Sequence, residues 1–274
     1  MDRRSLEGRW ALITGGGRGI GRAIALELAE RGADLILNYK SGKDAAEATA
    51  EELRAMGREA WTVQGDVRKP ADLDKLAAEV IERCPHLDIL VLNAAFGTID
   101  DVYNVGRASW KATFDTNVVA SWYLGKSLLP MLKQSRGCVL SLSSIGAVMP
   151  FPQYVAIGVS KSATEALVRQ MAVEWGRYGI RVNGISAGPV DTRAIDWFRY
   201  PNAVRQFARD KSVFKRMAEV DDLAPVAAFL CTDEARWITG QTIIADGGIT
   251  IGIDSTDFDA QAAGSTEAEL EDRS

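Results

Sequence analysis

The chain has 274 residues, 47% of them hydrophobic, and a formal charge of −5 at pH 7. A chain of this length can bury a sizeable core, and no change of composition within residues 1–253 marks a linker, so we expect one domain there. Three widely spaced cysteines and a single histidine, His86, argue against a disulfide framework, a zinc site and a histidine-rich metal cage.

The negative charge is concentrated at one end of the chain. Residues 254–274 hold seven acids against one arginine, a net −6, which leaves +1 for residues 1–253. The near-neutral body predicts no nucleic-acid partner, and the acidic tail has the composition of a disordered segment. The N-terminus lacks a signal-peptide core, and no run of about 18 apolar residues follows, so we expect a cytoplasmic protein without a membrane partner.

Short apolar segments alternate with helical patterns along the chain. The predicted strands cover 9–14, 34–38, 60–64, 88–93, 138–143, 180–186 and 241–246. The predicted helices cover 19–31, 43–56, 70–83, two stretches after residue 93, and about 154–177. Strands this apolar are buried on both faces, and the alternation implies right-handed crossovers. We therefore predict an α/β fold with a doubly wound parallel sheet, a Rossmann-type single domain.

A glycine-rich loop, TGGGRGIG, joins the first predicted strand to the first helix at residues 14–21. Glycines at this place let the backbone approach a pyrophosphate, which gains from the N–H groups and dipole of the helix start. The loop therefore predicts a dinucleotide site that includes Gly15, Arg18, Gly19, Ile20 and Gly21.

The end of the second strand bears on which dinucleotide binds. An NAD site usually places a carboxylate there for the ribose 2′-hydroxyl, but this chain has Asn38, Tyr39, Lys40 and Ser41. Without an acid to repel a 2′-phosphate, and with Arg18 and Lys40 nearby to pair with it, NADPH is favoured over NADH. The alternative is that both cations are ordinary solvated charges.

Several motifs together resemble the short-chain dehydrogenase/reductase family over residues 8 to about 250. They are TGGGRGIG, GDV at 65–67, LNAAFG at 92–97, Asn117, LSLSS at 140–144, Lys161 and TGQTIIADGG at 239–248. The resemblance implies a homotetrameric Rossmann enzyme in which an asparagine, a serine, a tyrosine and a lysine cooperate. The matching residues are Asn117, Ser144, Tyr154 and Lys161. On the cofactor side it implies that Asp66 and Val67 lie by the adenine, that Asn93 lies by the ribose, and that Thr192 contributes.

The stretch YVAIGVSK, residues 154–161, departs from the usual family spacing. The family tyrosine commonly stands four residues before the lysine, where this chain has Ile157, whereas Tyr154 stands seven residues before it. At about 100° per residue, both positions lie within roughly 40° of the lysine's direction, but the rise grows from roughly 6 Å to roughly 10.5 Å. This spacing and the NAAF sequence are similar to enoyl-acyl-carrier-protein reductase III, the FabL type.

The displaced tyrosine suits the reduction of an enoyl thioester. There the hydride reaches C3 while negative charge develops on the thioester oxygen, so the proton donor belongs further from the nicotinamide. We expect Tyr154 to serve the enolate, Lys161 to bind the ribose and support the tyrosine, Asn117 to organise a helix and a water path, and Ser144 to polarise the carbonyl or fix the cofactor. Alternatively, Tyr154 is a packed aromatic and Ser144 an ordinary strand-end hydroxyl.

Residues 193–217 fall where the family places its substrate lid. Five aromatic residues there suit an acyl chain, and seven bases against two acids suit phosphopantetheine or an acidic carrier protein. We therefore expect an NADPH-dependent enoyl-thioester reductase whose substrate is carried on acyl carrier protein or CoA. A carbonyl or 3-oxoacyl reductase, and a catalytically silent NADP(H)-binding protein, are the alternatives.

Overall fold

The computed structural model describes residues 5–252, and its centre is one parallel sheet of seven strands. The strands are β1 (Trp10–Thr14), β2 (Asp34–Tyr39), β3 (Ala60–Gln64), β4 (Ile89–Leu92), β5 (Cys138–Ser144), β6 (Arg181–Ala187) and β7 (Thr242–Ala245). Their order across the sheet is β3-β2-β1-β4-β5-β6-β7, so the chain reverses its direction of winding between β1 and β4. This is the predicted Rossmann-type topology, in which ligands bind at the carboxyl ends of the strands.

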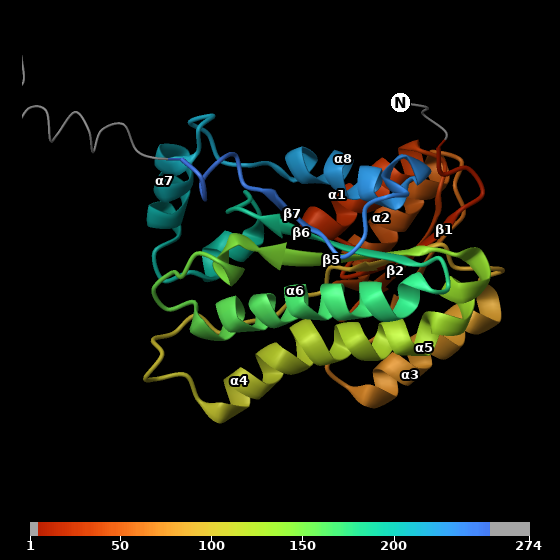
Figure 1. Ribbon diagram of the computed structural model, residues 1–274, viewed down its shortest axis with the longest axis horizontal. Helices are drawn as coiled ribbons and strands as arrows, with labels where there is room; N and C mark the ends of the chain where they lie inside the picture. The colour runs from red at the N-terminus through yellow and green to blue at the C-terminus, as the bar shows by residue number, and fades with distance from the viewer. Residues whose placement is uncertain (1–4, 253–274) are drawn as a thin grey trace, which may run out of the picture.

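Helices cover both faces of the sheet (Figure 1). On one face lie α1 (Gly19–Glu30), α2 (Lys43–Ala55) and α8 (Val220–Cys231), with α1 packed along α8. On the other lie α3 (Pro70–Arg83), α4 (Arg107–Phe114), α5 (Ala120–Ser135) and α6 (Val155–Gly176). A π-helical turn, Asp115–Val119, joins α4 to α5. The remaining helix, α7 (Pro201–Lys211), and the short 3-10 helix Arg193–Trp197 form the segment expected to be the lid.

The two faces of the sheet carry separate apolar cores. Leu35 and Leu37 of β2 face the α1 and α8 side, whereas the intervening Ile36 faces the α3 and α5 side, and all three are fully buried. This alternation explains why the strands are apolar at every position rather than at every second one. The sheet ends at β7, where Ile243 and Ile244 are exposed.

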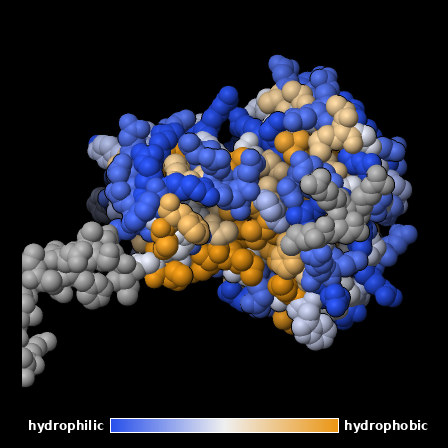
Figure 2. All heavy atoms as spheres, turned by 90° about the horizontal axis from the view of Figure 1, so that it is seen from above, coloured by the Kyte–Doolittle hydropathy of each residue, from blue (hydrophilic) through white to orange (hydrophobic). Residues whose placement is uncertain are grey.

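Apolar side chains gather in one broad patch on the surface of the molecule in the view from above (Figure 2).

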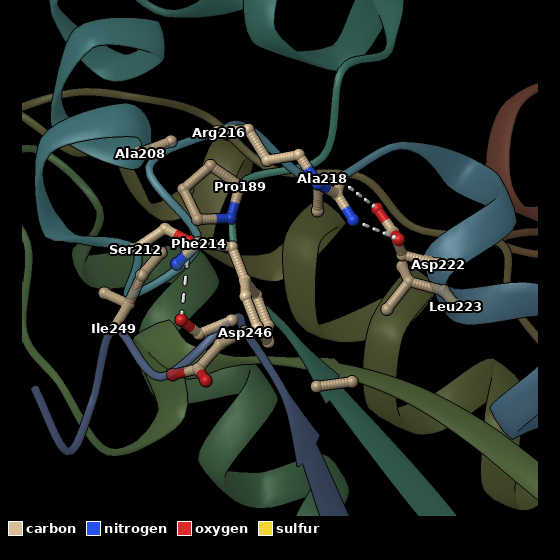
Figure 3. A pocket seen from close by; sticks show the side chains of 12 residues that line it. Pro189, Ala208, Ser212, Phe214, Arg216, Ala218, Asp222, Leu223, Asp246 and Ile249 are labelled. Carbon is tan, nitrogen blue, oxygen red and sulfur yellow. Dashed lines mark hydrogen bonds and ion pairs between the residues drawn. The ribbon is translucent and has the colours of Figure 1, made fainter.

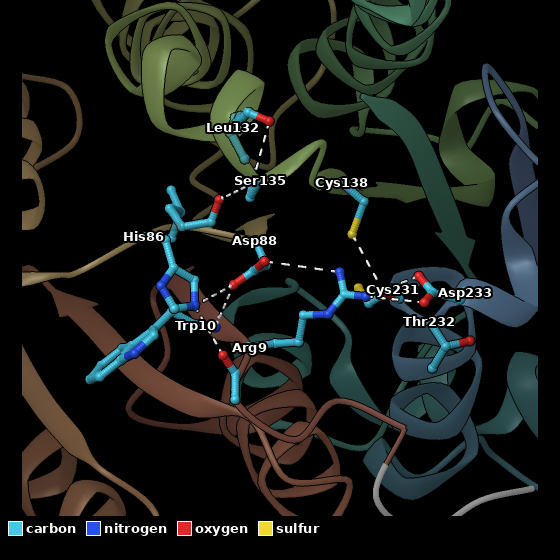
Figure 4. A network of polar contacts seen from close by, with 12 residues as sticks. Arg9, Trp10, His86, Asp88, Leu132, Ser135, Cys138, Cys231, Thr232 and Asp233 are labelled. Carbon is cyan, nitrogen blue, oxygen red and sulfur yellow. Dashed lines mark hydrogen bonds and ion pairs between the residues drawn. The ribbon is translucent and has the colours of Figure 1, made fainter. Parts of the chain in front are cut away.

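A charged network at the opposite end of the sheet from the glycine loop ties β1 to β4 (Figure 4). The buried carboxylate of Asp88 accepts the Trp10 N–H at 2.9 Å, and it lies 3.3 Å from the His86 ring and 3.9 Å from Arg9. Arg9 also pairs with Asp233 at 3.1 Å. The single histidine thus lies in a structural network, far along the sheet from the predicted site.

Most predicted elements agree with the structure to within two residues, but α7 was expected only as part of the lid, 193–217, and α8 was missed. Its residues were not predicted as a helix, although a capping box between Glu219 and Asp222 begins it. The predicted disordered tail, 254–274, lies outside the described residues. Across residues 5–252, no helix combines the length and apolarity needed to cross a membrane, and the cytoplasmic location stays a prediction.

We predict that Asp88→Ala lowers the free energy of unfolding by about 1–3 kcal/mol, because it leaves the buried Trp10 N–H without an acceptor. Asp88→Asn keeps an acceptor and should cost less. Urea denaturation followed by circular dichroism measures both, with the exposed Asp221→Asn as the control. Equal stability of Asp88→Ala and the wild type would show that the network does not hold the strand ends together.

Candidate active site

The glycine loop has the close packing that a dinucleotide site requires. Gly15 has a φ of +66° and Gly19 a φ of +55°, both in the left-handed region that favours glycine. A Cβ on Gly21 would lie 2.4 Å from the Gly15 carbonyl oxygen and 2.5 Å from Nδ2 of Asn93. Side chains are thus excluded where backbone N–H groups at the start of α1 would face the pyrophosphate of a dinucleotide. Thr192 also approaches this loop, 3.8 Å from the place of a Gly19 Cβ.

Asn93 and Thr14 fix the loop to the sheet. The Asn93 side chain donates to the carbonyls of Thr14 at 2.9 Å and Gly15 at 3.1 Å. In return, the Thr14 hydroxyl accepts the backbone N–H groups of Asn93 and Ala94, each at 3.0 Å. The predicted ribose-side residue therefore also holds the shape of the phosphate loop.

The predicted adenine side carries more positive charge than the sequence indicated. Asp66 is buried and pairs with Lys40 at 3.1 Å and with Arg68 at 2.8 Å. The Arg68 hydrogen bond is the largest influence on this carboxyl, and its pKa lies far below the usual range. Arg68, which sequence reasoning missed, also stacks over Phe96 at 5.4 Å. We expected Lys40 to be available to pair with a 2′-phosphate, but its ammonium already has Asp66 as an acidic partner.

Other predicted cofactor residues differ in their exposure. Arg18, at the N-terminus of α1, and Ser41, after β2, are exposed, whereas Val67 is buried beside Asp66. The buried side chain of Asn38 donates to the carbonyls of Val63 and Gly65, so its amide group fastens β2 to the end of β3.

Tyr154 lies at the end of β5, where Ser144 is. It is the N-cap residue of α6, and its hydroxyl lies 3.5 Å from the Ser144 hydroxyl. Its ring stacks on Phe198 of the lid at 5.9 Å and meets Phe151 edge-on at 6.2 Å. Burial raises the pKa of Tyr154, with an opposing effect from Ser144, so the phenol keeps its proton at neutral pH.

Two glycines make this position of the tyrosine possible, and sequence reasoning missed both. A Cβ on Gly146 would lie 2.4 Å from the Tyr154 ring, and a Cβ on Gly158 would lie 2.8 Å from the Gly146 carbonyl oxygen. Gly158 is visible in YVAIGVSK and could have been read as a close helix contact. Ile157, at the usual tyrosine position, instead packs on Gly97, where an added Cβ would lie 2.0 Å from its side chain.

Lys161 is buried, with its ammonium donating to the carbonyl of Leu142 on β5. Burial lowers the pKa of Lys161 to about 8, and the nearby Glu165 acts in the opposite direction. This lysine can therefore change its protonation near neutral pH, which suits a group that passes a proton or supports a phenolate.

Asn117 lies in the π-helical turn and connects the loop after β4 to α6. Its side chain accepts the Phe96 N–H and donates to the Phe96 carbonyl, both at 3.0 Å, and it donates to Ser160 at 2.8 Å. The expectation that it organises a helix agrees with these contacts. A water path from Asn117 to Lys161 stays a prediction.

A cavity of about 200 Å³ lies behind the lid, next to the end of β7 (Figure 3). Its charged side chains already have partners: Arg216 pairs with Asp222 at 2.6 Å, and Asp246 accepts the N–H groups of Gly248 and Thr250 at 2.8 Å. The pair of Arg216 and Asp222 fastens the end of the lid segment to α8, and the Val213 N–H, which donates to the Gly247 carbonyl at 2.9 Å, fastens it to the chain after β7.

Comparisons with known proteins agree with this geometry. A family model described as Enoyl-(Acyl carrier protein) reductase matches residues 15–250. The chain belongs to the short-chain dehydrogenase/reductase family. Its members are oxidoreductases that use nicotinamide cofactors, in keeping with the loop around Gly15 and the pair of Tyr154 and Lys161.

Similar curated proteins of this family are reductases with different substrates in their names. The chain is 36% identical to 1-cyclohexenylcarbonyl-CoA reductase of Streptomyces collinus over 252 residues, 91% of this chain and 88% of that protein. It is 34% identical to a 3-oxoacyl-[acyl-carrier-protein] reductase, FabG, of Staphylococcus epidermidis, with 87% and 98% of the two chains covered.

Similar solved structures differ in their cofactor. The angucycline C-6 ketoreductase LanV with bound NADP has a TM-score of 0.83 and 32% identity, covering 90% of this chain and 98% of that one. A 7α-hydroxysteroid dehydrogenase complexed with NADH has a TM-score of 0.86 and 30% identity, covering 92% and 97%.

We predict that Gly21→Ala abolishes nicotinamide-cofactor binding, because the methyl group would displace the Gly15 carbonyl and the Asn93 amide from the phosphate loop. Gly176→Ala is the matched control, since a Cβ there meets nothing within 4 Å. Titration of NADPH fluorescence measures both variants. Unchanged binding by a folded Gly21→Ala protein would contradict the assignment of this loop.

Proposed function

We propose that this enzyme reduces the carbon–carbon double bond of an enoyl thioester with NADPH. The observation that carries the proposal is the contact of the displaced Tyr154 with Ser144, while Ile157 fills the usual tyrosine position against Gly97. A phenol is thus present at the end of β5, but not one helical turn from Lys161, where a ketone would need it.

Each residue of the site has its own proposed role in the reaction. NADPH, which the glycine loop and Lys161 would hold, would supply the hydride for C3 of the enoyl group. Tyr154, protonated at neutral pH, donates a hydrogen bond and then a proton toward the enolate that forms. Lys161, whose ammonium donates to the Leu142 carbonyl on β5, supports the phenol electrostatically, and the Ser144 hydroxyl lies 3.5 Å from the Tyr154 hydroxyl. The aromatic cover of Phe198 and Phe151 keeps water from the phenol.

The choice of NADPH rests on charge at the end of β2. The place of the usual carboxylate holds Lys40 and Ser41, and Arg18 and Arg68 lie on neighbouring loops. Asp66 neutralises part of this charge, which leaves a net positive site suited to a 2′-phosphate.

We predict that the wild type binds NADPH at least tenfold more tightly than NADH, and that Lys40→Ala lowers this preference while leaving NADH affinity nearly unchanged. The exposed Lys43→Ala, on the first turn of α2, is the control. Fluorescence titrations at physiological salt measure all three proteins. Tighter binding of NADH by the wild type would reject the cofactor assignment.

The substrate is proposed to be an acyl thioester on CoA or an acyl carrier protein. The lid supplies aromatic surface through Phe198 and Phe207, which packs edge-on against Phe151 at 5.6 Å. One base of this positive surplus already has an acidic partner outside the lid segment, because Arg216 pairs with Asp222 of α8 at 2.6 Å. The weaker surplus favours CoA or a phosphopantetheine arm over a large acidic carrier surface.

A homotetramer is also proposed. Exposed apolar side chains lie on α5 and α6, including Trp122, Val159 and Val173, and on the edge strand β7. Unpaired sheet edges and apolar helix faces of this kind are commonly covered by a second copy.

The alternative is a carbonyl or 3-oxoacyl reductase, which the similarity to FabG favours. In that case Ser144 and Lys161 would act on a ketone without a tyrosine in the usual place. The two functions differ in what Tyr154 and Ile157 contribute, so that substitutions at these positions separate them.

We predict that Tyr154→Phe lowers enoyl turnover by about 10²–10⁴-fold, because a positioned acid is lost, and changes NADPH affinity little. Ile157→Tyr, which restores the four-residue spacing, should not create ketone reduction, because Ile157 points toward Gly97. NADPH consumption with crotonyl- and acetoacetyl-thioesters measures both. Wild-type activity on the ketone alone, or full enoyl activity of Tyr154→Phe, would overturn the proposal.

A further inference from the structure

Glu165 lies one helical turn beyond Lys161 on α6, and both side chains reach the same short stretch of β5. The ammonium of Lys161 donates to the Leu142 carbonyl, and the Glu165 carboxylate accepts the hydroxyl of the next residue, Ser143, at 2.7 Å. Residues four apart on a helix lie on one face, with about 5–6 Å between their Cβ atoms. Ser143 of β5 therefore holds the Glu165 carboxylate on the same face of α6 as the buried Lys161.

A third polar side chain extends this cluster. Ser186 on β6 is in register with Ser143, so that the two side chains lie on the same face of the sheet. Its hydroxyl is buried and has no hydrogen-bond partner within residues 5–252. Buried hydroxyls are ordinarily satisfied, and water commonly supplies the partner that the protein lacks. The surroundings of Glu165 are thus polar and able to solvate a charge.

The other polar neighbour on this side of the lysine, Asn117, is already occupied. Its backbone carbonyl accepts the hydroxyls of Ser121 at 2.9 Å and Thr164 at 3.3 Å. Its side chain is used by Phe96 and Ser160. Asn117 therefore fastens helices together, and its contacts bring no charge toward Lys161.

The remaining titratable groups on the elements packed against α6 do not compete with Glu165. Asp115, in the π-helical turn, pairs with Lys111 of α4, and Arg107 of α4 is exposed. Arg181 lies at the far end of β6, where it donates to backbone carbonyls near the end of α8. Tyr154 stays neutral. Glu165 is the one charged side chain within residues 5–252 that raises the pKa of Lys161.

We propose that Glu165, held in place by Ser143, is a positioning residue that keeps Lys161 in its ammonium form during turnover. The lysine must be charged to support the phenol after Tyr154 gives up its proton, and burial opposes that charge. The carboxylate offsets the effect of burial without touching the substrate. The proposal rests on the proposed function for its role in turnover, but the charge of Lys161 can be measured without any substrate.

The first experiment measures the titration of Lys161 itself. Protein labelled with ¹³C at lysine Cε is titrated by NMR, and the Lys161 signal is assigned from its absence in Lys161→Arg. In Glu165→Gln, Lys161 should lose its proton about 1 pH unit lower than in the wild type. Ser143→Ala, which releases the carboxylate, should give a smaller shift in the same direction. Glu174→Gln, an exposed acid on the same helix, should give none.

The second experiment measures turnover with whichever thioester the wild type reduces. Glu165→Gln should lose about fivefold in rate at pH 8 and less than about twofold at pH 6. The reason is that the variant lowers the charged fraction of Lys161 strongly at pH 8 and little at pH 6. A rate loss that is equal at both pH values would assign Glu165 a purely structural role and overturn the proposal.

An unshifted Lys161 titration in both Glu165→Gln and Ser143→Ala would also overturn it. If the wild type reduces no thioester, the proposed function fails, but the NMR titration still decides the role of Glu165. Ser143→Ala provides the same decision if Glu165→Gln does not fold.

Discussion

The burial of the Lys161 ammonium against the Leu142 carbonyl is the interaction on which the rest of the site depends. A buried charge is costly, and here one carbonyl and a carboxylate one turn away offset that cost. The contact between Lys161 and Leu142 holds α6 along the end of β5. It thereby brings Tyr154, at the start of the helix, to Ser144. The burial that anchors the helix also lowers the pKa of Lys161 to about 8.

The displaced tyrosine shows how a change of spacing can be built into an unchanged scaffold. Moving the phenol three residues toward the N-terminus takes it out of the first turn and onto the N-cap, where Gly146 and Gly158 leave room for its ring. Ile157 then becomes a packing residue against Gly97 rather than a remnant of a lost catalytic group. The phenol stays near Ser144, and seven residues of helix rise in place of four set it further along α6 from the lysine. Such a separation suits an enolate oxygen, which is remote from the carbon that receives hydride.

Much of this could be predicted from the sequence because it depends on local pattern. Continuous apolar runs predicted the strands to within two residues, because strands buried on both faces are apolar at every position. The glycines predicted the loop after the first strand, because positive φ angles favour glycine. Helix α8 was missed because Pro225 interrupts a sequence that is apolar on all sides, and the π-helical turn at Asn117 has no local signal. Asp66, the partner of Lys40, follows β3, and Ser143, the partner of Glu165, lies on β5, so only the folded sheet brings these pairs together.

The most direct test of the account is the position to which hydride is delivered. Wild-type enzyme is incubated with crotonyl thioester and NADPH that carries deuterium at both C4 positions, and the product is examined by NMR and mass spectrometry. The account predicts a saturated thioester with one deuterium on C3 and none on C2. Deuterium found only on the carbinol carbon of a 3-hydroxyacyl product from acetoacetyl thioester, with crotonyl thioester unchanged, would contradict it.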